Sequence, residues 1–211
     1  MDLVLYRDRA DAGRLLAGPV RDLGLVDPVV LGLPRGGVVV AAEVASVLGA
    51  PLDVIVVRKL GLPRNPELGM GAIGEGGVRL LNDEVLRTYG VTPRQLDAVE
   101  TAERAELARR LRLYRGDEGG VSLTGRDVVI VDDGIATGFT AGAACLVAKA
   151  QRASRVVLAV PVGPPDLDTR LAGVSDDVVC LAAPAHLIAV GQAYADFTQT
   201  TDDEVIRILR S

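Results

Sequence analysis

The chain has 211 residues, of which 49% are hydrophobic and 3% aromatic, with a formal net charge of −5 and two cysteines. The acidic balance argues against a nucleic acid or an anionic membrane as the main partner, and two cysteines provide neither a disulfide framework nor a zinc site. The length suits one domain over residues 1–211. Because aromatic residues are scarce, Val, Leu, Ile and Ala must fill the core, as in a buried parallel sheet.

The termini and the cysteines indicate an ordinary intracellular protein. Residues 1–20 carry Asp and Arg throughout, unlike a secretory signal, and apolar runs stay short of membrane-spanning length. We therefore expect a cytoplasmic location. Cys145 and Cys180 lie in apolar patterns and are expected to be small buried hydrophobes. His186, the only histidine, is more often a packed or surface residue than a catalyst.

The first quarter of the chain alternates helical and strand patterns. An amphipathic helix begins at Asp8, an apolar strand covers residues 29–33, and a helix over 38–48 ends at Gly49. A second apolar strand follows at 52–57. The strand–helix–strand order predicts a parallel sheet with right-handed crossovers.

The next segment interrupts this alternation. Residues 58–77 hold several Gly and Pro and little apolar pattern, which predicts a long mobile loop. A capping box at Thr92 and Gln95 then starts a helix that runs to about Tyr114. We expect a mobile loop and helical insertion over about 58–118.

The second half returns to the alternating pattern, with strands expected at 127–131, 156–161 and 178–181 and a helix over 138–153. A capping box beginning at Thr201 opens the C-terminal helix. The predicted fold is α/β, an open, mostly parallel twisted sheet flanked by helices, with its core at about 28–162 and additional elements at both chain ends.

The segment VVIVDDGIATGFT, residues 128–140, carries unusual residues at the end of a buried strand. Asp132 and Asp133 repel each other, so the pair contributes little to stability and indicates a ligand that needs negative charge and acceptors. Gly138 opens a helix whose N–H groups favour an anion such as phosphate. A plain strand–helix turn with Thr137 as N-cap is the alternative.

This segment resembles the phosphoribosyl pyrophosphate (PRPP) motif of the type I phosphoribosyltransferases: a hydrophobic strand, two acids, a short spacer and T-G-x-T. The resemblance implies that Asp132 and Asp133 hold the ribose hydroxyls and contact Mg²⁺ through water. It also implies that the following loop cradles the 5-phosphate through Ala136, Thr137, Gly138, Phe139 and Thr140.

Arg35-Gly36-Gly37 follows the first core strand. Two glycines let backbone amides approach a bulky anion, although a helix-initiating turn with a surface Arg would look the same. By resemblance, this turn is the pyrophosphate loop of the family.

Arg58 and Lys59 follow the second predicted strand, with Arg64 nearby, and alone they would be a solvated basic loop. By resemblance they meet the pyrophosphate, and the loop at 60–78 closes over the reaction.

The acceptor site is implied to lie in a hood built from the chain ends, about 1–27 and 163–211. Here Tyr194, Asp196 and Phe197 are candidates for an acceptor pocket, with an inward-packed hood core as the alternative.

Two departures from the patterns of known family branches narrow the range of candidate acceptors. Ala136 stands where the 6-oxopurine branch has an aspartate, and residues 161–164 read Pro-Val-Gly-Pro where that branch has a hood lysine. The loop at 58–77 also lacks the Lys/His-rich pattern of orotate enzymes. The chain resembles most the stand-alone bacterial phosphoribosyltransferase-like proteins whose acceptor is not settled.

The resemblance therefore predicts an enzyme that transfers the 5-phosphoribosyl group of PRPP to a nitrogenous acceptor, a nucleobase or related small molecule, with release of pyrophosphate. It implies Mg²⁺ as cofactor, a homodimer as the family's usual assembly, and catalytic roles for Asp132, Asp133, Arg58 and Lys59.

Two other classes remain possible. A regulator on the same fold would bind PRPP or a nucleotide without turnover. A phosphoryl-accepting receiver is disfavoured because Asp176 and Asp177 precede their strand instead of following it.

Overall fold

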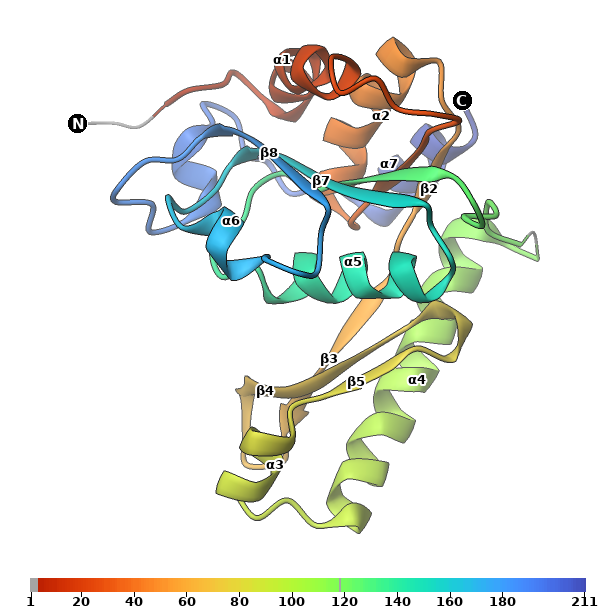
Figure 1. Cartoon of the computed structure of the whole chain (residues 1–211), viewed down its shortest axis with the longest axis vertical. Coiled ribbons are helices and arrows are strands. Elements are labelled where there is room, and N and C mark those ends of the chain that lie inside the picture. Colours follow the sequence, from red (N-terminus) through yellow and green to blue (C-terminus); the bar gives the residue numbers. More distant parts are fainter. Residues whose placement is uncertain (1–3, 118) are drawn as a thin grey trace.

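A five-stranded parallel sheet with strand order β2-β1-β6-β7-β8 forms the centre of the computed structural model, which describes residues 4–117 and 119–211. Alternate residues along the strands face opposite sides, so α1 and α2 cover one face and α5 covers the other (Figure 1). This confirms the predicted α/β fold. The bounds are β1 (Val29–Gly32), β2 (Leu52–Val54), β6 (Asp127–Val131), β7 (Arg155–Val162), β8 (Asp177–Ala182), α1 (Arg9–Arg21), α2 (Gly36–Leu48) and α5 (Phe139–Ala150).

A smaller antiparallel sheet of order β3-β4-β5 stands below the parallel sheet in Figure 1, beside the long helix α4. Its elements are β3 (Val57–Leu62), β4 (Asn65–Gly74), η1 (Glu75–Gly77), β5 (Arg79–Leu81), α3 (Asp83–Thr88) and α4 (Pro93–Arg115). The prediction of a long mobile loop over residues 58–77 is therefore wrong, because this segment forms a hairpin and a 3-10 turn.

The reason for the hairpin lies in apolar residues separated by glycines. Leu60, Met70 and Ile73 are buried in a cluster with α4. A Cβ on Gly61 would lie 2.4 Å from the Pro66 carbonyl oxygen, and one on Gly71 would lie 2.4 Å from the Leu80 carbonyl oxygen. The glycines that resembled loop residues allow this close approach of the backbones.

The second parallel strand is shorter than predicted. It ends at Val54, and the chain leaves the parallel sheet to begin β3 at Val57. Arg58 and Lys59 therefore lie within the antiparallel hairpin and not at the end of a parallel strand.

The predicted helix starts are confirmed for three helices. The Asp8 carboxylate accepts from the Asp11 N–H at 2.7 Å and caps α1, and the Thr92–Gln95 capping box begins α4. Thr201 caps α7 (Asp202–Leu209). Helix α5 begins one residue later than predicted, with Gly138 as its N-cap.

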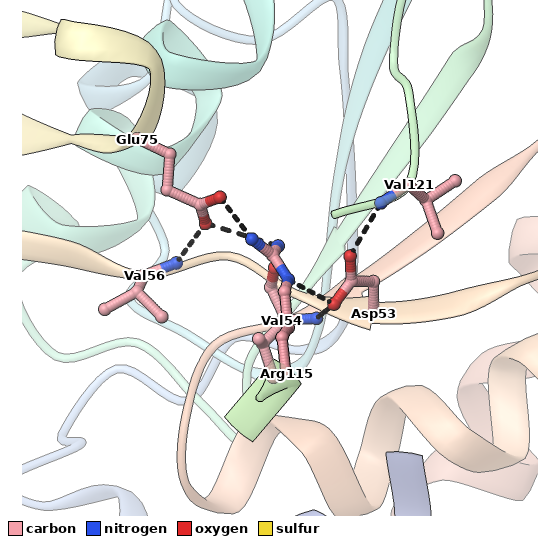
Figure 2. Close-up of polar contacts among 6 residues, drawn as sticks. All are labelled: Asp53, Val54, Val56, Glu75, Arg115 and Val121. Carbon is pink, nitrogen blue, oxygen red and sulfur yellow. Dashed lines mark hydrogen bonds and ion pairs between the residues drawn. The ribbon is translucent and has the colours of Figure 1, made fainter. Parts of the chain in front are cut away.

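Arg115, the last residue of α4, ties the antiparallel part to the parallel sheet (Figure 2). Its guanidinium donates to the Asp53 carboxylate at 2.8 Å, to the Val54 carbonyl at 2.7 Å and to the Glu75 carboxylate at 2.5 Å. Asp53 also accepts from the Val121 N–H at 3.0 Å. The Arg115, Asp53 and Glu75 side chains are 13%, 9% and 14% exposed, so this is a nearly buried ion network.

The N-terminal segment before α1 contacts the C-terminal part of the chain near Tyr194. Tyr6 forms a bridge to Tyr194, and its hydroxyl donates to the Pro161 carbonyl at 2.6 Å. Two short elements, α6 (Leu167–Arg170) and η2 (Val190–Ala193), belong to the C-terminal part. Among residues 4–117 and 119–211, no helix is long and apolar enough to cross a membrane.

Candidate active site

Asp132 and Asp133 follow β6 directly, at the edge where the carboxyl ends of the parallel strands meet. The Asp133 N–H donates to the Asp132 carboxylate at 2.9 Å. Burial raises the pKa of both carboxyls, and the charge of Asp133 contributes to the rise of the Asp132 pKa well above its ordinary value. Two crowded acids with raised pKa values are a property of functional sites more than of structural turns.

Arg9 holds Asp133, and sequence analysis did not identify it. Its Nε donates to the Asp133 carboxylate at 2.7 Å, and the two side chains are 11% and 16% exposed. The same guanidinium donates to the Thr198 carbonyl at 2.8 Å and lies 3.9 Å from the centre of the Phe197 ring. Because Arg9 opens an amphipathic helix, nothing in its local sequence distinguishes it from a surface arginine.

The Arg35-Gly36-Gly37 turn packs directly on the acid pair. A Cβ on Gly36 would lie 1.9 Å from an Asp133 carboxylate oxygen. A Cβ on Gly37 would lie 2.9 Å from the Asp132 Cα. Neither position accommodates a side chain, which accounts for both glycines. The Pro34–Arg35 peptide is cis.

The loop after the acid pair is open to solvent. Ala136, Thr137, Phe139 and Thr140 are exposed, and Gly138, with φ 84°, caps α5 through its backbone. Within the described residues, no side chain caps the first turn of α5. The N–H groups of that turn are therefore available to an anion.

Arg170, from the C-terminal part of the chain, borders this loop and was also missed. Its guanidinium donates to the Thr137 carbonyl at 3.4 Å, and its Nε donates to the Asp166 carboxylate at 2.9 Å. Arg170 thus places a positive charge beside the loop expected to hold the phosphate. Only the tertiary fold brings it there, because Arg170 lies 33 positions after Thr137 in the sequence.

Arg58 and Lys59 separate in the structure, because successive side chains of a strand point to opposite faces. A Cβ on Gly69 would lie 3.1 Å from the Phe139 ring and 3.4 Å from the Lys59 side chain, so the Lys59 stem lies beside the loop residue Phe139. Arg58 instead pairs with Glu103 of α4, at 2.6 Å. Lys59 joins the site region and Arg58 faces α4.

The three candidate acceptor residues have different environments. Tyr194 is 5% exposed, and its hydroxyl donates to the Asp133 carbonyl. Burial raises its pKa. Its ring stacks on Phe197 with centroids 5.0 Å apart, whereas Asp196 is exposed and accepts from the Thr198 hydroxyl at 2.6 Å. Tyr194 therefore supports the backbone of the acid pair.

The carboxylates at the site could bind a metal ion that takes its remaining ligands from water and from a bound phosphate. Among the described residues, no group of three or more His, Cys, Asp or Glu side chains could hold a metal ion. Asp132 and Asp133 supply two carboxylates. Mg²⁺ usually takes one or two carboxylates and completes its shell with water and phosphate oxygens, so the pair fits that ion.

Comparisons with known proteins identify the family of this chain. A sequence model of the family described as "Phosphoribosyl transferase domain" matches residues 6–182, which include the acid pair and both glycine-containing loops. The chain resembles the crystal structure of TT1426 from Thermus thermophilus, with 47% identity, a TM-score of 0.87 and coverage of 98% of each chain.

Two curated relatives come from the CDC 1551 / Oshkosh and H37Rv strains of Mycobacterium tuberculosis. Each is 58% identical over 205 residues, or 97% of this chain, and is named "Putative phosphoribosyl transferase". The chain spans 46% of the length of these relatives.

Proposed function

This chain belongs to the phosphoribosyl transferase family, and from that premise we propose that it transfers the 5-phosphoribosyl group of PRPP to a nitrogenous acceptor, with release of pyrophosphate. The observation that carries the proposal is the contact of the Arg35-Gly36-Gly37 turn with the acid pair. A ligand bound at the edge that they share would meet backbone amides of the turn and carboxylates of the acid pair.

The proposed arrangement of PRPP follows its charges. The 5-phosphate would bind the loop at 136–140 and the N-terminus of α5, where Arg170 adds positive charge. The ribose hydroxyls would donate to Asp132 and Asp133. The pyrophosphate would meet the amides of the Arg35-Gly36-Gly37 turn.

The basic pair of the hairpin would act unequally on the leaving group. Lys59 already lies beside Phe139 of the phosphate loop. Arg58 would have to leave Glu103 before it could reach the pyrophosphate. The pair would therefore contribute fully only if the hairpin rearranges.

Breaking the C1–O bond develops positive charge on the ribose ring and negative charge on the pyrophosphate. Carboxylates beside the ring stabilise the first charge, and backbone amides with Lys59 stabilise the second. Mg²⁺, when bound, neutralises part of the diphosphate charge. The Arg9 guanidinium opposes the rise of the Asp133 pKa that burial causes, and so favours the ionised form that accepts a ribose hydroxyl.

A pyrophosphate-release assay with PRPP, Mg²⁺ and a panel of nucleobases and small amines tests the proposal. We expect release with at least one acceptor, and its loss in Asp132→Asn/Asp133→Asn. Asp22→Asn, whose side chain is 68% exposed, is the control that should keep full activity. Equal activity of the double variant and this control would contradict the roles of the acid pair.

A regulator that binds PRPP without turnover is the second candidate. Two contacts favour it: Arg9 already engages Asp133, and Glu103 already engages Arg58. Calorimetric titration with PRPP separates the two functions, because a regulator would bind tightly and release no pyrophosphate with any acceptor. A homodimer stays an expectation of the family resemblance, which light scattering on the purified chain would test.

A further inference from the structure

The Arg35-Gly36-Gly37 turn also borders a cavity between α4 and α7. Its volume is about 410 Å³, and it is lined by Pro34, Arg35, Arg109, Arg110, Tyr114 and Asp202. Gly36 contacts the acid pair, whereas the Arg35 side chain lines this cavity. The turn therefore connects two separate places where an anion could bind.

The cavity is strongly basic in an otherwise acidic chain. Among the described residues, three arginines line it with one acidic residue, Asp202, whose carboxylate accepts from the Tyr114 hydroxyl at 2.8 Å. In the part of the chain that the structure describes, the Arg35 guanidinium makes no ion pair or hydrogen bond. Its N–H groups are therefore available to an anion that enters the cavity.

The other two guanidiniums share one partner. Arg109 and Arg110 both donate to Glu106, at 2.7 Å and 2.8 Å. These bonds lower the pKa of Glu106 to about 2, so its single negative charge is present at neutral pH. One carboxylate between two guanidiniums leaves donors for a further anion, because each guanidinium has five N–H groups.

We propose that this cavity is an anion site that binds a small phosphate-bearing molecule through Arg35, Arg109 and Arg110. Guanidinium forks match phosphate oxygens in geometry and charge, and the volume lies in the range of small-molecule sites. The site is separate from the loop at 136–140, and its existence does not depend on the proposed transferase activity.

A ligand bound at this site is coupled to the acid pair through the peptide bond between Arg35 and Gly36. Arg35 is bonded to Gly36, and Gly36 packs against Asp133. An anion that holds Arg35 restrains the turn from the side that faces α4 and α7. The bound molecule is either the diphosphate of the substrate or a separate phosphorylated effector, and both carry the same recognition chemistry.

Titration calorimetry with sodium pyrophosphate on the full chain, at low ionic strength and without Mg²⁺, tests the site. The test variant is R109Q/R110Q. The control is R104Q/R112Q, which removes the same charge from the same helix at positions that do not line the cavity. The control is matched because Arg104 pairs with Glu100 at 2.7 Å, as Arg110 pairs with Glu106 in the test variant. Because charge-assisted bonds to phosphate are lost, we expect about tenfold weaker binding in the test variant and less than about twofold change in the control.

Equal affinity in the test and control variants overturns the proposal, and so does the absence of pyrophosphate binding to the wild type. A melting temperature of R109Q/R110Q close to that of the control shows that the variant is folded.

Repeating the titration with saturating PRPP distinguishes the two sources of the bound phosphate. Competition assigns the site to the substrate diphosphate, and binding that persists assigns it to a separate effector. The pyrophosphate-release assay judges the transferase activity independently.

Discussion

The two halves of the proposed pyrophosphate site are held in different ways. The Arg35-Gly36-Gly37 turn is packed against the acid pair so closely that a single added carbon would overlap an Asp133 oxygen. The half that carries Lys59 belongs to a separate sheet, which α4 joins to the core through the Arg115 ion network (Figure 2). One half is fixed by backbone packing, and the other by paired charges together with side-chain packing against the core.

This difference indicates where the molecule can move. Because the glycine backbone of the turn packs closely against the acid pair, the turn has only one arrangement. A hairpin in its own sheet can change its position relative to the core while keeping its internal hydrogen bonds. Binding would then use a fixed turn and acid pair, and the hairpin would bring Lys59 over the ligand.

The largest expected effect comes from breaking the ion network. Arg115→Met leaves the Asp53 and Glu75 carboxylates, 9% and 14% exposed, without their counter-charge. We expect a loss of about 3 kcal/mol in the free energy of unfolding, measured by urea denaturation. Arg112→Met, at an exposed position of the same helix, is the control and should change little. Similar losses in both variants would mean that the network does not anchor the hairpin.

Adding one carbon to the fixed turn is the next test. Gly36→Ala must displace Asp133 or the turn, and a shift of about 1 Å in a catalytic group costs roughly 100-fold in rate. We expect that loss in kcat/KM for PRPP. Gly18→Ala is the matched control, because a Cβ there meets nothing within 4 Å. If Gly36→Ala and Gly18→Ala are equally active, the turn does not shape the site.

The acid pair predicts a pH effect on stability. A raised pKa in the folded state means that the folded chain binds more protons than the unfolded chain, so stability falls as pH rises through the titration of the pair. Asp132→Asn/Asp133→Asn removes this loss. At pH 8 we expect its melting temperature to exceed that of the wild type by roughly 2–4 °C, the shift that about 1 kcal/mol produces in a chain of this size.

The two melting temperatures should converge below about pH 4, where the aspartates are protonated in both states. A variant that melts below the wild type at every pH would indicate that the pair stabilises the fold. The Arg9 ion pair acts in the opposite direction on Asp133, so Arg9→Gln should steepen the pH dependence of the wild type.

Local patterns in the sequence predicted most of the fold. The parallel strands are continuous apolar runs, and the caps at Asp8, Thr92 and Thr201 are short motifs whose hydrogen bonds span three residues. The acid pair and the glycine turn could be placed at one sheet edge because carboxyl ends of parallel strands meet there. Such features need no knowledge of distant residues.

The missed features all depend on tertiary contacts. Arg9 meets Asp133 across 124 positions of sequence, and Arg115 meets Asp53 across 62. The hairpin was hidden because Gly61 and Gly71 interrupt its apolar pattern where backbones approach closely. Neighbouring arginine and lysine in a sequence also do not reveal that strand alternation sends Arg58 and Lys59 to different partners.

The smallest expected effect comes from a comparison of two neighbouring residues of the hairpin, Arg58 and Lys59. Arg58 is partly exposed and paired with Glu103, and such pairs contribute about 0–1 kcal/mol to stability. Because Arg58 faces α4 and not the site region, Arg58→Gln should change the KM for PRPP less than about threefold, roughly 0.6 kcal/mol. Lys59→Met removes the charge of a side chain whose stem lies beside Phe139, and should raise that KM about tenfold through the lost charge-assisted bond. If Arg58→Gln instead costs as much as Lys59→Met, Arg58 leaves Glu103 during turnover, and the hairpin moves as a unit toward the acid pair.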